Sequence, residues 1–287
     1  MYSVNYHRAA SVAEAARLLK NGDAKLLSGG MTLIPAMKTR LAAPSDLVDL
    51  SRIKELQGVK VSGKTITIGA ATTHFDVAND EKLRKACPAL AHMASLIGDP
   101  AVRHKGTIGG SIANNDPAAD YPAALLALGA TIVTNKRAIA ADKFFKGLFE
   151  TALKEGEIVT AVSFTAPAKA AYEKFRNPAS RYAIVGVFVA KGKDGVSVAV
   201  TGAGDDGVFR SKEIEAVLAK NFAASALEGV KVSAKNLMTD IHASAEYRAN
   251  LIAVMAKRAV AAANAGGIGE YDITGRTDLQ GGGGGGG

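Results

Sequence analysis

Two glycine-centred turns constrain the fold of this chain more than any other feature of its sequence. The first is Leu27-Ser28-Gly29-Gly30-Met31-Thr32 and the second is Thr107-Ile108-Gly109-Gly110-Ser111, and each follows or joins apolar, strand-like sequence. Glycine lets the backbone approach a ligand closely and direct N–H groups toward it, while neighbouring hydroxyl groups supply further donors. Together the turns predict a clamp for a diphosphate group, although a glycine-rich strand-to-helix connection would explain the first turn alone.

Charged and polar residues surround the second turn. The basic run 103–105 precedes it and would attract a diphosphate, but a solvated loop explains this run equally well. After the turn, carboxylates and amides in residues 114–122 are suited to bind sugar hydroxyls. Asp116 and Asp120 are the candidate acids, and a capped helix start before a proline is the alternative interpretation of both.

Composition limits the possible partners. The 35 basic and 27 acidic side chains give a net charge of +8, but the cations are scattered, so we expect an acidic partner or anionic ligand and no nucleic acid. Cys87 is the only cysteine, whereas iron–sulfur clusters usually need about four thiolates, so any cluster must belong to a partner. No signal-like N-terminus or apolar run of roughly 20 residues is present, which predicts a soluble cytoplasmic protein.

Hydrophobic periodicity divides the 287 residues into three units and a tail, and predicts an α+β fold. Residues 1–57 predict a β-α-β-type layer whose first helix opens at a capping box, Ser11-Val12-Ala13-Glu14. Residues 58–168 combine alternating strands with helices, residues 169–268 place three strands before two helices, and residues 269–287 form a tail ending in polyglycine. The expected strands are 25–28, 47–50, 59–68, 130–134, 158–164, 172–176, 183–191 and 196–201, and the later helices are 33–41, 75–86, 89–97, 212–220 and 245–264.

Other motifs carry no chemistry. Gly202-Ala203-Gly204-Asp205-Asp206-Gly207 matches G-x-G-x-x-G, but residues 208–210 look extended and two carboxylates would repel a diphosphate, so a tight turn is expected. The 5 histidines show no metal-ligand spacing. No nucleophile elbow, zinc motif or P-loop occurs, which leaves hydrolase and kinase functions without support.

The chain resembles the FAD-binding medium subunits of the molybdenum hydroxylases, the family of carbon monoxide dehydrogenase and xanthine dehydrogenase. The matching stretches are residues 28–38, residues 107–111 with Asp116-Pro117 and Asp120, and residues 181–186, and the likeness runs from about residue 5 to about residue 265. It implies a two-subdomain, PCMH-type FAD-binding fold, with subdomains 1–57 and 58–168, followed by a C-terminal flavoprotein domain, 169–268.

The resemblance also implies which residues contact FAD. The first turn holds the pyrophosphate through backbone amides, the second wraps the phosphates and ribityl chain, and Tyr182 covers one face of the flavin ring. Ile97, Ile158 and Lys174 approach the flavin, although two core residues and a surface lysine are the ordinary alternatives. No catalytic residue or metal ligand is expected. The implied cofactor-binding residues are Leu27, Ser28, Gly29, Gly30, Met31, Thr32, Ile97, Thr107, Ile108, Gly109, Gly110, Ser111, Asp116, Asp120, Ile158, Lys174 and Tyr182.

The function implied by resemblance is electron transfer within an oxidoreductase. The chain would be the FAD-carrying subunit of a heterotrimeric molybdenum hydroxylase, with molybdopterin in a large partner subunit and two [2Fe-2S] clusters in a small one. It would take electrons from those clusters and pass them to a terminal acceptor, which the sequence leaves open among NAD, a quinone, a cytochrome and oxygen. A dimer of heterotrimers is implied.

Two other functions are also compatible with the sequence. An autonomous FAD-dependent oxidase or dehydrogenase would usually bring a substrate domain with a catalytic base or a covalent flavin linkage, and the glycine turns contain no histidine for such a linkage. An assembly protein could keep the fold without binding FAD. The substrate of the complex is not encoded in this chain.

Overall fold

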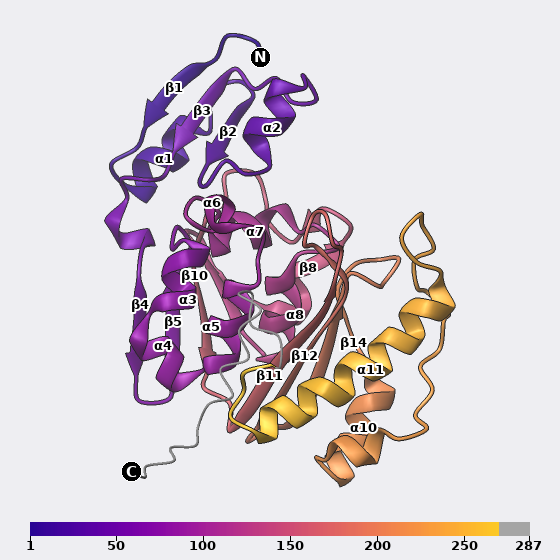
Figure 1. The fold of residues 1–287 in the computed structure, drawn as a ribbon. Helices are drawn as coiled ribbons and strands as arrows, with labels where there is room; N and C mark the ends of the chain where they lie inside the picture. The colour runs from indigo at the N-terminus through magenta and orange to yellow at the C-terminus, as the bar shows by residue number, and fades with distance from the viewer. Residues whose placement is uncertain (270–287) are drawn as a thin grey trace, which may run out of the picture.

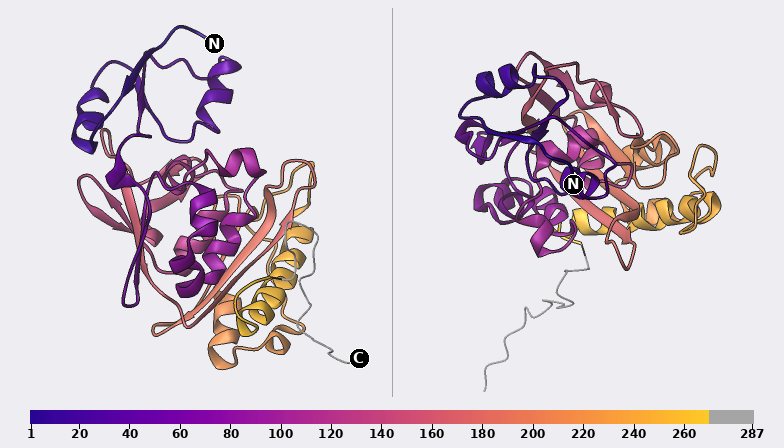
Figure 2. Two further views of the ribbon diagram at one scale, coloured as in Figure 1. Left: turned by 60° about the vertical axis from the view of Figure 1, so that its left-hand side comes forward. Right: turned by 90° about the horizontal axis from the view of Figure 1, so that it is seen from above.

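The computed structural model describes residues 1–269, so the polyglycine and nearly all of the tail 269–287 lie outside the described residues. The fold is α+β, with sheets of three, five, four and two strands (Figure 1). The three-stranded sheet forms a lobe of its own, and the other sheets make up the body of the molecule (Figure 2). Within these residues no helix combines the length and apolar character that crossing a bilayer requires.

The N-terminal lobe is the β-α-β-type layer expected from the sequence. Its strands are parallel in the order β1-β3-β2, where β1 is Asn5–Arg8, β2 is Ala24–Leu27 and β3 is Asp46–Asp49. Helix α1 (Val12–Leu18) begins at the expected cap, where the Ser11 hydroxyl accepts from the Glu14 amide at 3.1 Å. Helix α2 (Leu33–Lys38) starts directly after the first glycine turn. This turn therefore lies at the carboxyl end of β2.

The second unit is an antiparallel sheet with helices packed against it. The strand order is β4-β5-β10-β6-β7, so β10, which is late in the sequence, lies at the centre of the sheet. The strands are β4 (Val59–Ser62), β5 (Thr65–Gly69), β6 (Thr131–Thr134), β7 (Ala138–Ala140) and β10 (Val159–Thr165). A short helix, η1 (Lys54–Leu56), precedes β4. The other helices are α3 (His74–Asn79), α4 (Glu81–Ala86), α5 (Pro88–Ser95), α6 (Pro100–Arg103), α7 (Ile108–Asn114), α8 (Asp120–Ala127) and α9 (Ala141–Phe144). Strand β8 (Phe145–Gly147) pairs with β9 (Glu150–Thr151).

The third unit is a four-stranded antiparallel sheet that is buried on both faces. Its strands are β11 (Lys169–Arg176), β12 (Ala183–Gly192), β13 (Gly195–Thr201) and β14 (Phe209–Arg210). Phe188 packs toward α5 and α8, whereas Val187 and Val189 pack toward the helices that follow, which explains the continuous apolar run of β12. These helices are α10 (Lys212–Lys220), η2 (Ala224–Leu227) and α11 (Ala245–Asn264), and α10 and α11 coincide with the two helices expected.

A buried arginine ties α11 to the ends of two inner strands of this sheet, β12 and β13. The Arg248 guanidinium, 2% exposed, donates to the carbonyl of Ile184 at 2.6 Å, to that of Gly202 at 2.5 Å and to Asp240 at 2.7 Å. The amide of Gly202 in turn donates to the carbonyl of Pro117 at 2.8 Å. The helix, the strand ends and the segment that precedes α8 are thereby joined by one set of hydrogen bonds. The expected tight turn at residues 202–207 lies here and leads into β14.

Candidate functional site

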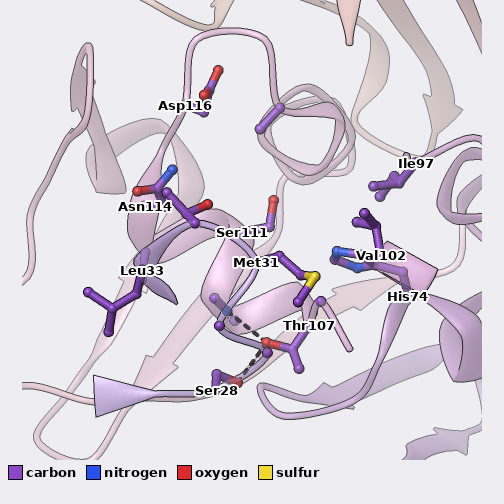
Figure 3. Close-up of a pocket in the computed structure, with 18 of the residues that line it drawn as sticks. Ser28, Met31, Leu33, His74, Ile97, Val102, Thr107, Ser111, Asn114 and Asp116 are labelled. Atoms are coloured by element: carbon purple, nitrogen blue, oxygen red, sulfur yellow. Dashed lines mark hydrogen bonds between the residues drawn. The ribbon is translucent and has the colours of Figure 1, made fainter. Parts of the chain in front are cut away.

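A cavity of about 890 Å³ lies where the three units meet (Figure 3). Its wall comes from the first glycine turn and α2, from the segment between α5 and α8, and from residues 179–182 between β11 and β12. The volume is near the upper end of the range of about 300 to 1,000 Å³ that is typical of small-molecule sites. The cavity therefore accommodates an extended ligand that touches all three units.

The first turn offers unpaired backbone donors to this cavity. Gly30 has a φ of +72°, a left-handed conformation that favours glycine, and residues 29–32 all line the cavity. The backbone amides donate to no acceptor among the described residues at four successive positions, Gly29, Gly30, Met31 and Thr32. Successive free N–H groups in such a turn are suited to bind an anion.

The second turn has a different structure from the one that the glycines predicted. Thr107 is the N-cap of α7, so Gly109 and Gly110 belong to a helix, and the Gly110 amide donates to the Thr107 hydroxyl at 3.1 Å. The amides of Ile108, Gly109 and Ser111 donate to the carbonyls of Thr72, Ala70 and Thr107 at 3.1, 2.8 and 3.0 Å. These amide groups already have acceptors, because contacts with the loop that follows β5 stabilise the helix start. The Ser111 and Asn114 side chains remain available at the cavity wall.

The two turns contact each other directly. The hydroxyl oxygens of Ser28 and Thr107 lie 2.8 Å apart (Figure 3). A Cβ added to Gly29 would lie 2.1 Å from the carbonyl oxygen of Lys105, so only glycine allows the backbones to approach this closely. Both glycine turns therefore line one cavity, as expected from the sequence, but only the first turn has free amides to offer a diphosphate.

A buried ion pair supports the wall formed by α8. The Lys174 ammonium, whose side chain is 2% exposed, lies 2.9 Å from Oδ1 of Asp120 and donates to the carbonyl of Leu96 at 3.1 Å. The Tyr172 hydroxyl donates to the same Asp120 oxygen at 2.5 Å, and burial and this carboxylate raise the pKa of Tyr172. Lys174 therefore balances the charge of Asp120 without lining the cavity itself, whereas Asp120 lines it.

A half-exposed aromatic side chain, Tyr182, lines the cavity near two carboxylates. Tyr182 is 48% exposed, and its pKa is raised by burial and by the neighbouring charges of Asp116 and Asp120. Burial and the charge of Asp120 raise the pKa of Asp116, which accepts from the amide of Ala118 at 2.8 Å. Ile97 and Ile158 add apolar surface to the wall. The aromatic and apolar side chains among the lining residues suit a flat, apolar ring system.

The cavity brings together all but two of the residues expected to bind the cofactor. Ile108 is fully buried in the core and Lys174 lies behind Asp120, so neither lines the cavity. His74 lines it without having been expected, because an isolated histidine at a helix start carries no distinctive sequence signal. Burial, together with the charge of Arg103, lowers the pKa of His74 to about 4, and its Nδ1 lies 3.3 Å from the Tyr121 hydroxyl. The imidazole is therefore neutral at neutral pH.

Comparison with known proteins now decides the family. Residues 2–167 match the family described as the FAD binding domain in molybdopterin dehydrogenase. This chain belongs to that family. Its N-terminal part is an FAD-binding domain, and the free amides of the first turn, the polar side chains and the apolar side chains that line the cavity fit a flavin dinucleotide.

The similarity to relatives extends over almost the whole chain. The carbon monoxide dehydrogenase medium chain of Hydrogenophaga pseudoflava is 36% identical over 275 residues, which cover 90% of this chain and 96% of the relative. A solved carbon monoxide dehydrogenase from that organism, lacking the Mo-pyranopterin moiety of its molybdenum cofactor, has a TM-score of 0.83 at 35% identity and covers 92% of this chain and 98% of its own. Quinoline 2-oxidoreductase from Pseudomonas putida 86 has a TM-score of 0.82 at 28% identity, with coverage of 92% and 98%. The α+β, PCMH-type fold and the assignment as an oxidoreductase subunit of the molybdenum hydroxylase family are confirmed.

Proposed function

We propose that this chain is the FAD-carrying electron-transfer subunit of a heterotrimeric molybdenum hydroxylase. It receives electrons from the [2Fe-2S] clusters of a small partner subunit and passes them to a terminal acceptor, while a large partner subunit carries the molybdopterin centre. The observation that carries this proposal is the cavity in which free amides, a buried carboxylate and a half-exposed tyrosine line one extended wall. The names of the relatives, which are medium chains of dehydrogenases, support it.

Each part of the wall has its own role toward the cofactor. The amides of residues 29–32 bind the diphosphate, and the side chains of Ser111 and Asn114 bind adjacent polar groups. Asp120, held by Lys174 and Tyr172, accepts a hydrogen bond from a hydroxyl of the ligand. Tyr182 excludes water from one face of the ring. Bound FAD supplies the capacity to accept and release electrons.

The subunit organisation follows from what this chain lacks and from its relatives. Cys87 is the single cysteine, so the iron–sulfur clusters must lie in another chain. We assign residues 1–57 and 58–168 as the two FAD-binding subdomains and 169–268 as the C-terminal flavoprotein domain, and we expect a dimer of heterotrimers. The relatives named for carbon monoxide, glyceraldehyde and quinoline share this chain's fold or sequence, so the substrate is determined by the large subunit.

The first test is the cofactor content of the purified chain. A flavin absorbance spectrum, with one equivalent of FAD released on denaturation, is expected. An unbound chain that also fails to take up added FAD would contradict the proposal and leave the assembly protein as the better function.

The second test is anaerobic reduction of the assembled complex by its substrate. The flavin absorbance should bleach only when both partner subunits are present, because electrons reach this chain through them. Bleaching of the isolated chain by an organic substrate would instead identify an autonomous oxidase or dehydrogenase.

A further inference from the structure

The loop that carries Tyr182 connects β11 to β12, and its residues 179–182 are the part of the third unit that lines the cavity. Two backbone hydrogen bonds close this loop. The Asn177 amide donates to the carbonyl of Tyr182 at 2.8 Å, and the Arg181 amide donates to the carbonyl of Asn177 at 2.9 Å. Because both bonds lie within the loop, they do not fix its position relative to the other two units.

Arg181 makes the contact between this loop and the second unit. Its guanidinium Nη1 donates to the carbonyl of Gly98 at 3.3 Å, and both residues line the cavity. Among residues 1–269 this is the only hydrogen bond of the Arg181 side chain, which forms no ion pair there. The carbonyl of Gly98 is therefore the group that holds the arginine side chain.

The segment that supplies this carbonyl is itself held in place. It directly follows α5, and Gly98 has a φ of +51°. The Arg103 guanidinium donates to the same carbonyl at 3.1 Å and to that of Ile97 at 3.0 Å, and the Lys174 ammonium donates to that of Leu96 at 3.1 Å. Cations are favourable beside the carbonyls at the C-terminal end of a helix. The acceptor of the loop arginine thus has a defined position.

The backbone next to Tyr182 has an unusual conformation. Arg181 has a φ of +63°, which is uncommon for a residue other than glycine. Such a conformation persists only where the surrounding structure enforces it. Tyr182 is 48% exposed, so packing alone does not fix its ring. The direction of this ring depends on the backbone at position 181, which the contact with Gly98 fixes.

We propose that Arg181 is a positioning residue, which places Tyr182 against the flavin ring by holding the loop to the carbonyl of Gly98. The inference rests on the proposed function, in which Tyr182 excludes water from one face of the ring. It adds the contact through which the third unit closes the cofactor site. Direct binding of the cofactor by the guanidinium is the alternative, and the experiment separates the two.

The main test measures the fluorescence of FAD bound to the full-length chain. A tyrosine in contact with a flavin quenches the emission by transferring an electron to the excited ring, so the emission reports the position of Tyr182. Arg181→Ala removes the donor and keeps a Cβ at the same positive φ. We expect it to recover most of the emission that Tyr182→Ala recovers, whereas Arg181→Lys, which retains a cationic donor, should keep most of the quenching. The FAD dissociation constant of Arg181→Ala should rise only roughly fivefold, as for the loss of one hydrogen bond.

Two further variants serve as controls. Arg176→Ala is the matched control, because Arg176 is exposed at the end of β11 and its side chain has no hydrogen bond or ion pair among the described residues. It should emit as the wild type does. The double variant Arg181→Ala/Tyr182→Ala should emit as Tyr182→Ala does and bind FAD no more weakly, because Arg181 acts through the tyrosine.

The outcomes distinguish this inference from the proposed function. Retained quenching in Arg181→Ala would overturn the inference alone. A further rise in emission or a further loss of affinity in the double variant would also overturn it, because the arginine would then act on the cofactor directly. If Tyr182→Ala leaves the emission unchanged, the proposed role of Tyr182 fails and the inference fails with it. A chain that takes up no FAD contradicts the proposed function itself.

Discussion

The two glycine turns have similar sequences but make different contributions to the cavity. In the first, the amides of residues 29–32 have no acceptor among the described residues, and Gly30 is left-handed. In the second, the amides of residues 108–111 are bonded within the protein, and the glycines belong to α7. The first turn therefore supplies donors to a ligand, and the second supplies a rigid wall. A glycine pair in the sequence indicates a close approach of the backbone to another group. Only the hydrogen bonds in the structure show whether that group is a ligand or another part of the protein.

The largest effect is expected from a substitution that forces the two turns apart. In Gly29→Ala the methyl group would meet the carbonyl of Lys105 at 2.1 Å, so we expect a loss of about 3 kcal/mol in unfolding free energy and loss of FAD retention. Urea denaturation and flavin absorbance measure the two effects. Gly192→Ala is the control, because nothing lies within 4 Å of its added Cβ, and it should behave as the wild type. Full FAD occupancy in Gly29→Ala would refute the close approach.

Acid should weaken the packing beneath the second turn through His74. The pKa of His74 is lowered from 6.5 to about 4 by burial, so the unfolded state binds this proton first as the pH falls. The stabilisation that comes from a neutral His74 is complete above the pKa of the unfolded state. It is lost as the pH falls toward the pKa of the folded state. We expect a loss of about 2 kcal/mol between about pH 7.5 and about pH 5. His74→Gln should flatten that part of the pH profile, and an unaltered slope would contradict the assignment.

Matched alanine substitutions distinguish the roles of the two turns. Gly30→Ala forces a side chain into the left-handed region and toward Ile34, so it should destabilise the fold by about 1 kcal/mol and weaken FAD binding about tenfold. Gly110→Ala meets the Thr107 hydroxyl at 3.0 Å but improves helix propensity, so a smaller effect is expected. Titration of the apoprotein with FAD provides both affinities. Equal weakening in the two variants would show that the turns act alike.

The smallest effect concerns the contact between the hydroxyl groups. Ser28→Ala removes only the 2.8 Å bond to Thr107, which is expected to stabilise the fold by about 1 kcal/mol. Thr107→Val removes this bond and the cap of α7 together. A double-mutant cycle, measured by urea denaturation, isolates the interaction energy between the Ser28 and Thr107 side chains. A coupling energy near zero would mean that backbone packing alone holds the turns together.

Much of the fold could be predicted from periodicity, whereas the chemistry of the site depended on contacts distant in sequence. Helices at 212–220 and 245–264 have amphipathic patterns that tertiary packing leaves intact. The sequence does not predict helix α7, because two glycines lower its helix propensity; the cap at Thr107 and the acceptors on Ala70 and Thr72 compensate for this. The pairing of Lys174 with Asp120 joins β11 to α8, and no local pattern could reveal it.

The clasp formed by Arg248 limits how this protein can be divided. The guanidinium holds the carbonyls of Ile184 and Gly202, and Gly202 in turn holds Pro117 close to the acids of the cavity wall. A chain truncated ahead of α11 would leave these two carbonyls without their donor. The start of β12, which directly follows Tyr182, would then lose a contact that fixes its position. We therefore expect gene fusions or domain exchanges to preserve the cavity wall only when they retain the last helix together with the region that matches the FAD-binding family.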